Sequence, residues 1–178
     1  MSSKRILPFA LLMSGALSAQ YTATVKTTVT KTENADWKKW SDKECVINFP
    51  GHWTNEGSMG TGALVIFFAP PDPDGGFRER VLITTMDAKG KTVAELAATL
   101  EADAPLGMTS PQKMTSEVTD DAASVELSGT IDGQPVRVKR ELSLRGEKAW
   151  VLTYIAPPAR YDDALYLADA MFMSFAVK

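Results

Sequence analysis

Gly-Ala-Leu-Val-Ile-Phe-Phe-Ala-Pro, residues 62–70, is the densest apolar run of the chain outside its N-terminal region. The run is too short for an average helix, is rich in β-branched and aromatic residues, and is bounded by glycine and proline. It therefore predicts a strand that is buried on both faces. A turn-rich loop follows at 70–76, and residues 77–87 predict a second strand that runs back beside the first. A strand buried on both faces needs a layer of structure on each side of its sheet.

The size and composition of the chain are those of one globular domain, or of one domain with an extension. The chain has 178 residues, of which 44% are hydrophobic and 23% are charged. A chain of this length buries about two-thirds of its unfolded surface, so it needs no disulfide to fold. Its single cysteine, Cys45, excludes an internal disulfide and any cysteine-rich zinc site.

The N-terminal residues have the order of a secretory signal peptide. Lys4 and Arg5 precede a mostly apolar stretch at 6–17, and small residues follow around Ala19. This order predicts a signal peptide at 1–19, cleaved after about Ala19, and a mature protein in the periplasm or outside the cell. The alternative is an uncleaved anchor, although the stretch is short for a bilayer. No cysteine follows the stretch, so there is no lipobox, and the sequence predicts no stable membrane anchor after cleavage.

The charge of the mature chain argues against nucleic-acid binding. Cleavage after Ala19 removes two cations and no acid, which leaves 17 Lys and Arg against 22 Asp and Glu, a net charge of −5. Domains that bind nucleic acid carry the opposite excess, because they must neutralise phosphates. Two kinds of partner stay open, another envelope protein or a small ligand. The sequence indicates no oligomeric state.

Residues 20–42 form a threonine-rich N-terminal segment. Its part at 21–32 predicts either an edge strand or a loose solvated arm, and both interpretations stay open. Trp37 and Trp40 lie three residues apart, a spacing that predicts one helical turn at 33–40. Residues 43–49 predict a strand with Cys45, Ile47 and Phe49 on one side, and 54–61 predict a polar loop.

The rest of the chain predicts two helices and a run of antiparallel strands. Thr92 and Glu95 have the spacing of a capping box, so residues 92–104 predict an amphipathic helix. Asp132-Gly133 predicts a two-residue hairpin turn, because both residues tolerate positive φ. Further strands are expected at 113–119, 124–131, 134–145 and 149–156, and a closing helix at 161–172. The chain therefore predicts an α/β (α+β) fold in which helices cover both faces of an antiparallel sheet.

In this order the elements resemble the PsbP-like fold, which includes DcrB-like envelope proteins. The resemblance is carried by Cys-Val-Ile-Asn-Phe-Pro-Gly-His-Trp at 45–53, the strand that starts at Phe77, Thr-Val-Ala-Glu-Leu at 92–96, Asp-Gly-Gln-Pro at 132–135, Ala-Trp-Val-Leu-Thr-Tyr at 149–154, and Ser174-Phe175. It implies an α/β/α sandwich over residues 43–178, with binding or assembly roles and no shared enzymatic chemistry. The absent lipobox differs from lipid-anchored members, and residues 20–42 have no counterpart.

Few residues of the chain are candidates for catalysis or metal binding. His52 is the only histidine, so a two-histidine metal site is excluded, and a catalytic imidazole would have to be His52. The alternative is that His52 is a polar loop residue that packs on Trp53. Cys45 is expected to be a small core residue, because it lies on the inward side of its strand. Residues 72–75, Asp-Pro-Asp-Gly, lack the later ligands of a calcium loop and predict a tight turn. The sequence predicts no metal and no cofactor.

A basic row lies on the outward side of the strand predicted at 134–145. Arg137, Lys139 and Arg145 share this side because strand side chains alternate. Such a row is either an ordinary solvated face or a docking strip for an acidic partner. Arg140 interrupts the inward row, and we expect it near a margin of the sheet or paired with an acid.

Two functions from different classes remain. The first is a secreted or periplasmic, non-enzymatic binding or assembly protein, whose candidate contacts are the loops at 52–61 and 70–76 together with His52, Trp53, Arg137, Lys139 and Arg145. The alternative is a small hydrolase that uses His52 with Asp72 or Asp74. A cleft that holds His52 near a carboxylate and an exposed hydroxyl would favour the enzyme.

Overall fold

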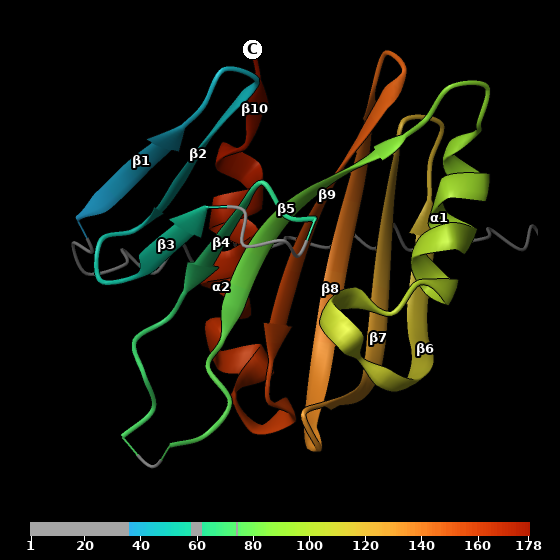
Figure 1. Ribbon diagram of the computed structural model, residues 1–178. Helices are drawn as coiled ribbons and strands as arrows, with labels where there is room; N and C mark the ends of the chain where they lie inside the picture. Colours follow the sequence, from blue (N-terminus) through green and yellow to red (C-terminus); the bar gives the residue numbers. More distant parts are fainter. Residues whose placement is uncertain (1–35, 58–61, 74) are drawn as a thin grey trace, which may run out of the picture. The chain divides into compact units, whose positions relative to one another are not determined.

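The computed structural model of the chain describes residues 36–57, 62–73 and 75–178 (Figure 1). The predicted signal peptide at 1–19 and the threonine-rich part at 21–32 lie outside these residues, and so does Asp74. Within the described ranges, no helix is long and apolar enough to cross a membrane.

Two antiparallel sheets make up the β part of the fold. The larger sheet has seven strands in the order β3-β4-β5-β9-β8-β7-β6. In that order their bounds are Thr54–Gly57, Val65–Phe68, Arg80–Asp87, Lys148–Ala156, Gln134–Arg145, Ala122–Ile131 and Thr109–Val118. The smaller sheet has the order β1-β2-β10, with bounds Trp37–Ser41, Cys45–Pro50 and Ala176–Val177. The described strand pairs are antiparallel, as the short turns of the sequence predict.

Strands β5 and β9 contribute alternate side chains to two hydrophobic clusters. Leu82, Val151 and Ile155 lie in the first cluster with helix α1 (Val93–Ala102). Their neighbours Val81, Ile83, Trp150 and Tyr154 lie in the second cluster with helix α2 (Pro158–Ser174) and strand β2. Successive side chains of a strand point to opposite sides of its sheet. The two clusters therefore take alternate side chains from the same two strands, and each cluster includes one of the helices.

The apolar run at 62–70 contains β4, and its burial confirms the prediction. Val65 and Phe67 belong to the second cluster and Ile66 to the first, and all three are buried. The run is not the middle of the sheet, however, because β4 is the second strand from one edge. The middle strand is β9, whose residues after Lys148 are all buried.

Two local signals of the sequence are confirmed. Thr92 caps α1: its hydroxyl accepts a hydrogen bond from the Glu95 amide at 3.3 Å, and the Glu95 carboxylate accepts one from the Thr92 amide at 2.8 Å. A short 3-10 helix, η1 (Pro105–Gly107), follows α1. Asp132 and Gly133 both have positive φ, 52° and 77°, and form the turn that joins β7 to β8.

The predicted helical turn at 33–40 is wrong, because Trp37 and Trp40 lie in strand β1. This strand pairs with β2 along its whole length. Residues three apart in a strand point to opposite faces. Accordingly, Trp40 packs edge-on against Phe67, at 6.2 Å between ring centroids, whereas Trp37 is 38% exposed.

The predicted polar loop at 54–61 is also wrong in part, because residues 54–57 form strand β3. All four of its side chains are exposed, and β3 pairs only with β4. A polar edge strand has no apolar alternation to reveal it. Its pairing with β4 through the main chain stabilises it instead.

The position of Arg140 differs from both expectations. Its side chain is 5% exposed, so it does not lie at a margin of the sheet. Its Nη1 donates hydrogen bonds to the main-chain oxygens of Leu100 and Asp103, at 2.9 and 2.7 Å, and not to an acid. The last carbonyls of a helix have no partner within the helix. Arg140 supplies donors to the end of α1 and thereby ties this helix to β8.

Cys45 is a core residue, as predicted, and we expect its thiol to be unreactive in the folded protein. Burial, helped by the nearby Asp42 carboxylate, raises the pKa of Cys45 to about 12. Disulfide reagents react with the thiolate, which is scarce and inaccessible here. At pH 8 the folded protein should react with Ellman's reagent about a hundredfold or more slowly than the protein in guanidinium chloride. Cys45→Ser, which has no thiol, gives the background signal. Rapid stoichiometric labelling of the folded protein above this background would contradict the burial of Cys45.

Candidate functional site

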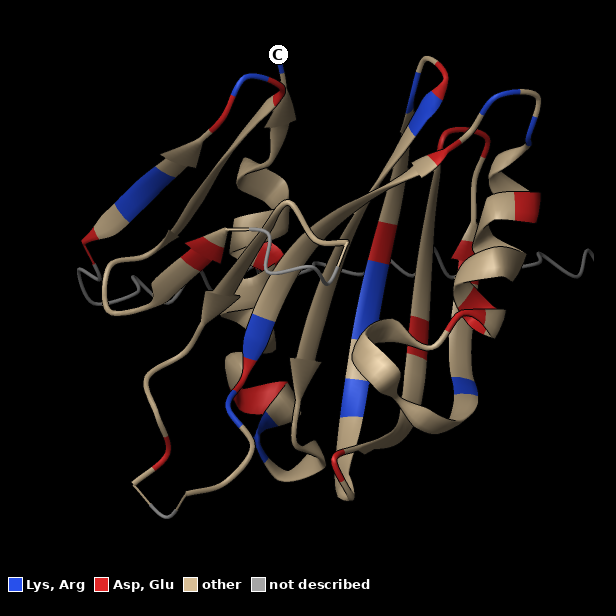
Figure 2. Ribbon diagram, in the orientation of Figure 1, with Lys and Arg blue, Asp and Glu red and all other residues tan. Residues whose placement is uncertain are grey.

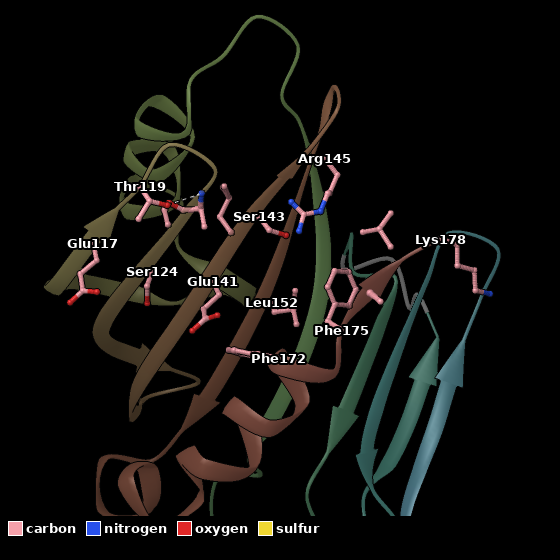
Figure 3. A pocket seen from close by; sticks show the side chains of 15 residues that line it. Glu117, Thr119, Ser124, Glu141, Ser143, Arg145, Leu152, Phe172, Phe175 and Lys178 are labelled. Atoms are coloured by element: carbon pink, nitrogen blue, oxygen red, sulfur yellow. Dashed lines mark hydrogen bonds between the residues drawn. The ribbon is translucent and has the colours of Figure 1, made fainter. Parts of the chain in front are cut away.

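A hollow lies beside the C-terminal end of α2. Helix α2 packs mainly on β2, β8 and β9, whereas α1 packs on β6, β7 and β8. On β7, Val125 and Leu127 point into the first cluster with α1, so the alternate residues Ser124 and Glu126 lie on the other side of the strand. There, a groove of about 750 Å³ opens between β7, β8 and the end of α2 (Figure 3).

One row of paired residues crosses the floor of this groove. Strand register aligns Glu117 of β6 with Ser124 of β7, and Ser124 with Glu141 of β8. Glu141 is in turn opposite Leu152 of β9. All four residues line the groove, so a small serine separates two glutamates. The small side chain leaves the floor hollow at this point.

The wall and the far end of the groove come from the last residues of the chain. Phe172 and Phe175 supply an apolar wall, and Phe175 packs against Trp150 with 5.4 Å between ring centroids. Arg145 and Lys178 lie toward one end of the groove, and Glu117 and Glu141 toward the other (Figure 3). The groove therefore has an acidic end, a basic end and an apolar side.

The predicted basic row is divided between the body of the sheet and the groove. Arg137 is only 23% exposed, forms ion pairs with Glu126 and Asp162 at 3.3 and 3.2 Å, and has its guanidinium 3.9 Å from the ring centroid of Tyr161. Lys139 binds Asp169 of α2 and Glu141 at 2.7 and 3.0 Å. Arg145 lines the groove and is exposed. Arg137 and Lys139 are thus only partly exposed and are paired with acids, and blue and red segments both occur along β8 in Figure 2. Their role as a docking strip stays a prediction.

The ion pairs of Lys139 have a consequence for stability that Arg145 does not share. Burial alone would lower the pKa of Lys139, but the hydrogen bonds that it donates to Asp169 and Glu141 raise it. Lys139→Glu places a third carboxylate beside these two, and we expect it to lower the free energy of unfolding by about 2 kcal/mol. Arg145→Glu should stay within about 0.5 kcal/mol of the wild type. Urea unfolding of both variants is the measurement, and equal midpoints would contradict the ion pairs described.

A second cavity, of about 620 Å³, contains both residues of the hydrolase hypothesis that the structure describes. His52, Trp53 and Asp72 line it together with Glu79 and Arg160. Arg160 joins the loop to α2, because it binds Asp72 at 2.9 Å and Glu79 at 2.8 Å. Glu79 is almost fully buried, and burial raises its pKa despite the neighbouring Arg160.

The geometry of this second cavity does not assemble a hydrolase. His52 is exposed, and within the described part of the chain it makes no hydrogen bond to a carboxylate. The described residues around the cavity include no serine, threonine or cysteine that could act as a nucleophile. Among the described residues, no group of three or more His, Cys, Asp or Glu side chains is placed to hold a metal ion.

Sequence reasoning singled out Arg145 as a site residue but missed the other residues that form the groove. Glu117, Ser124 and Glu141 are ordinary outward residues of three different strands, and only register brings them into one row. Phe175 follows the end of α2, and the sequence indicates it as a mark of the fold and not as a site residue. The available signal was the alternation of small polar and apolar residues at 122–128, which marks one face of β7 as uncovered.

The order of the strands, the two clusters and the two helices define a PsbP-like fold. The solution structure of cyanobacterial PsbP (CyanoP) from Synechocystis sp. PCC 6803 matches with a TM-score of 0.61 and 16% identity, over 83% of this chain and 95% of that one. PA94 from Pseudomonas aeruginosa and LpqN from Mycobacterium tuberculosis, which is involved in cell envelope biogenesis, each match with a TM-score of 0.49. PA94 is 13% identical and covers 75% of this chain and 94% of its own; LpqN is 11% identical and covers 80% and 92%.

The resemblance drawn from the sequence is therefore confirmed at the level of the fold. No protein-family model matches the sequence, and no curated protein is significantly similar to it. At these identities the likeness concerns the fold alone, and one fold supports many functions. The function has to be argued from the site of this chain.

Proposed function

We propose that this chain is a secreted or periplasmic, non-enzymatic binding protein of PsbP-like fold that holds part of its partner in the groove beside α2. The groove carries the proposal. It combines a polar sheet floor, an apolar wall and charged groups of both signs in about 750 Å³. Binding sites of this kind pair an apolar surface with a few placed polar groups.

The architecture that presents the groove is an α/β/α sandwich in this proposal. Alternate residues of β5 and β9 meet α1 in one cluster and α2 in the other, which supports helices on opposite faces of the larger sheet. The small sheet shares the second cluster with α2 through Ile47 and Phe49. The helix and the small sheet together leave the outer strands uncovered on that side, and the groove lies there.

Binding is a better account than hydrolysis because each site lacks a catalytic arrangement. The groove has two glutamates and an arginine, but Ser124 and Ser143 have no histidine beside them among its lining residues. The cavity at His52 has the imidazole but no hydroxyl or thiol. The serine hydroxyls and the imidazole that a hydrolase would combine thus lie in two different sites.

The compartment in this proposal rests on residues 1–19, whose basic start and apolar stretch support export. We expect the native protein to begin near Gln20 and to be recovered outside the cytoplasm. Intact-mass measurement of the protein purified from its own cells decides between the alternatives. A cytosolic species that retains Met1 would contradict export.

Site-specific photo-crosslinking tests the groove as the binding site. A photoreactive amino acid at Ser143, in the groove, should give a discrete adduct in the producing cells, and the same amino acid at exposed Lys89 should give none. Ser124→Trp, which fills the floor, should abolish the Ser143 adduct while the urea midpoint stays close to that of the wild type. Adducts of equal yield at both positions, or at neither, would overturn the proposal.

A further inference from the structure

The charges of the groove follow the period of an extended chain. Glu141, Ser143 and Arg145 are alternate residues of β8 and lie on the same side of it. Alternate residues of a strand are about 7 Å apart, so the acidic and basic positions are separated by about 13 Å along β8. Residues 1 and 5 of an extended peptide are separated by the same distance, if the peptide lies over the face of the sheet and runs along β8.

The acidic end has more than one carboxylate. Glu117 lies two strands away from Glu141 in the same row, and Asp169 is the second partner of Lys139. Lys139 is thus shared by two acids, Glu141 and Asp169. Together with Glu117, these groups give the acidic end of the groove a net negative charge. A cationic side chain at this end would meet complementary charge.

The basic end has donors that the described residues of the protein do not use. Arg145 is exposed, and its Nη1 donates to the main-chain oxygen of Leu144, which leaves most of its five N–H groups for other partners. Lys178 adds positive charge at the same end, although its Nζ donates to Ser41 and to the Asp42 carbonyl. A guanidinium with spare donors suits a carboxylate.

The side between these two ends is apolar. Phe172 and Phe175 line it, and Val177 lies beside them in the lining. An aliphatic or aromatic side chain placed midway between the two charged ends would contact this wall.

From this arrangement we infer that the groove binds an extended polypeptide segment of about five residues, with a basic side chain at one end, an apolar side chain in the middle and an acidic side chain at the other. The inference rests on the proposed function and specifies its partner. A ligand of one charge sign would place one of its ends against like charge. A free amino acid is too short to span about 13 Å.

The test uses blocked synthetic peptides and the mature full-length protein. The probe Lys-Ser-Leu-Ser-Asp places its lysine, leucine and aspartate on one side when extended. Titration by fluorescence anisotropy at low salt should show it binding about fivefold more tightly than either Lys-Ser-Leu-Ser-Lys or Asp-Ser-Leu-Ser-Asp, because one exposed ion pair distinguishes them. Replacing the leucine with serine should also weaken binding. A peptide of reversed sequence is no control, since an extended chain can bind in either direction.

An exchange of charge at the groove makes the test specific. Arg145→Glu gives the groove acidic groups at both ends, so its preference should change from the Lys/Asp probe to the Lys/Lys probe by about fivefold. Lys89→Glu makes the same change of charge at an exposed site outside the groove and should keep the preference of the wild type. The preference should shrink as salt rises.

Two results would overturn the inference. The first is that the wild type and Arg145→Glu each bind all the peptides equally tightly, or that neither protein binds any of them. The second is a Ser143 adduct that proves to be a glycan or a lipid. Both outcomes leave the proposed function standing if the adduct still depends on the groove. Loss of the groove-dependent adduct removes the proposed function itself, whatever the peptides do.

Discussion

Replacing Phe67 with alanine is expected to lower the free energy of unfolding by about 3–5 kcal/mol, as for other large aromatic residues in protein cores. Phe67 of β4 is 0% exposed and contacts Phe49 of β2 and Trp40 of β1, at 4.9 and 6.2 Å between ring centroids. It is therefore one of the residues through which the larger sheet meets the smaller one. The alanine variant loses the buried surface of the ring and leaves a cavity between the two sheets.

Phe68→Ala is the matched control for this prediction. Phe68 is the next residue of β4, is half-buried, and has the Arg78 guanidinium 4.9 Å from its ring centroid. We expect its loss to cost about 1–2 kcal/mol, because less surface is removed from the core. Urea unfolding measures both variants. If Phe67→Ala keeps the midpoint of the wild type, the face of β4 toward β2 is open and the packing of the two sheets is wrong.

The sequence predicts those parts of the fold in which one residue and its near neighbours carry the signal. Cys45, Ile47 and Phe49 alternate along β2, and all three are buried. The capping box at Thr92 and the turn at Asp132 depend on groups within a few residues of each other. Such local signals do not depend on what the rest of the chain does.

Strands β1 and β3 could not be predicted in the same way, because their stability comes from pairing partners. β1 pairs with β2, which on its other side takes up β10 from the end of the chain: Ala176 lies opposite Val46. β3 is entirely exposed. Neither strand buries an alternating apolar face of its own, so no pattern within the segment distinguishes it from a loop.

The candidate site was missed for a related reason. The groove takes its residues from β6, β7, β8, β9, α2 and β10, and each residue is unremarkable within its own element. Of the residues singled out in the sequence, Arg145 lies in the groove, His52 and Trp53 line the other cavity, and Arg137 and Lys139 are bound to acids. A pattern of charge along one strand cannot show which of its side chains a distant helix will cover.

Arg140 is the clearest case of a long-range role, and its removal is the second large effect that we expect. Its side chain, buried on β8, supplies both of the hydrogen bonds that reach the Leu100 and Asp103 carbonyls at the end of α1. The buried Leu100 carbonyl left without a donor costs about 1–3 kcal/mol, the part-buried Asp103 carbonyl costs less because water can reach it, and the lost side chain leaves a cavity. The guanidinium also faces the negative end of the helix dipole. Arg140→Ala should therefore lower the free energy of unfolding by about 2–4 kcal/mol.

A local measurement separates this role from a general loss of packing. Arg140→Met keeps an apolar stem of similar length but has no donor, so it should recover the part of the loss that comes from the cavity and none of the part that comes from the carbonyls. Hydrogen exchange should become faster in the last turn of α1 in both variants, more than in β9, because the helix end loses its attachment to β8. Arg145→Ala on the same strand is the control and should change neither quantity by more than about 0.5 kcal/mol. Equal protection of α1 in Arg140→Met and the wild type would show that the helix end does not depend on this arginine.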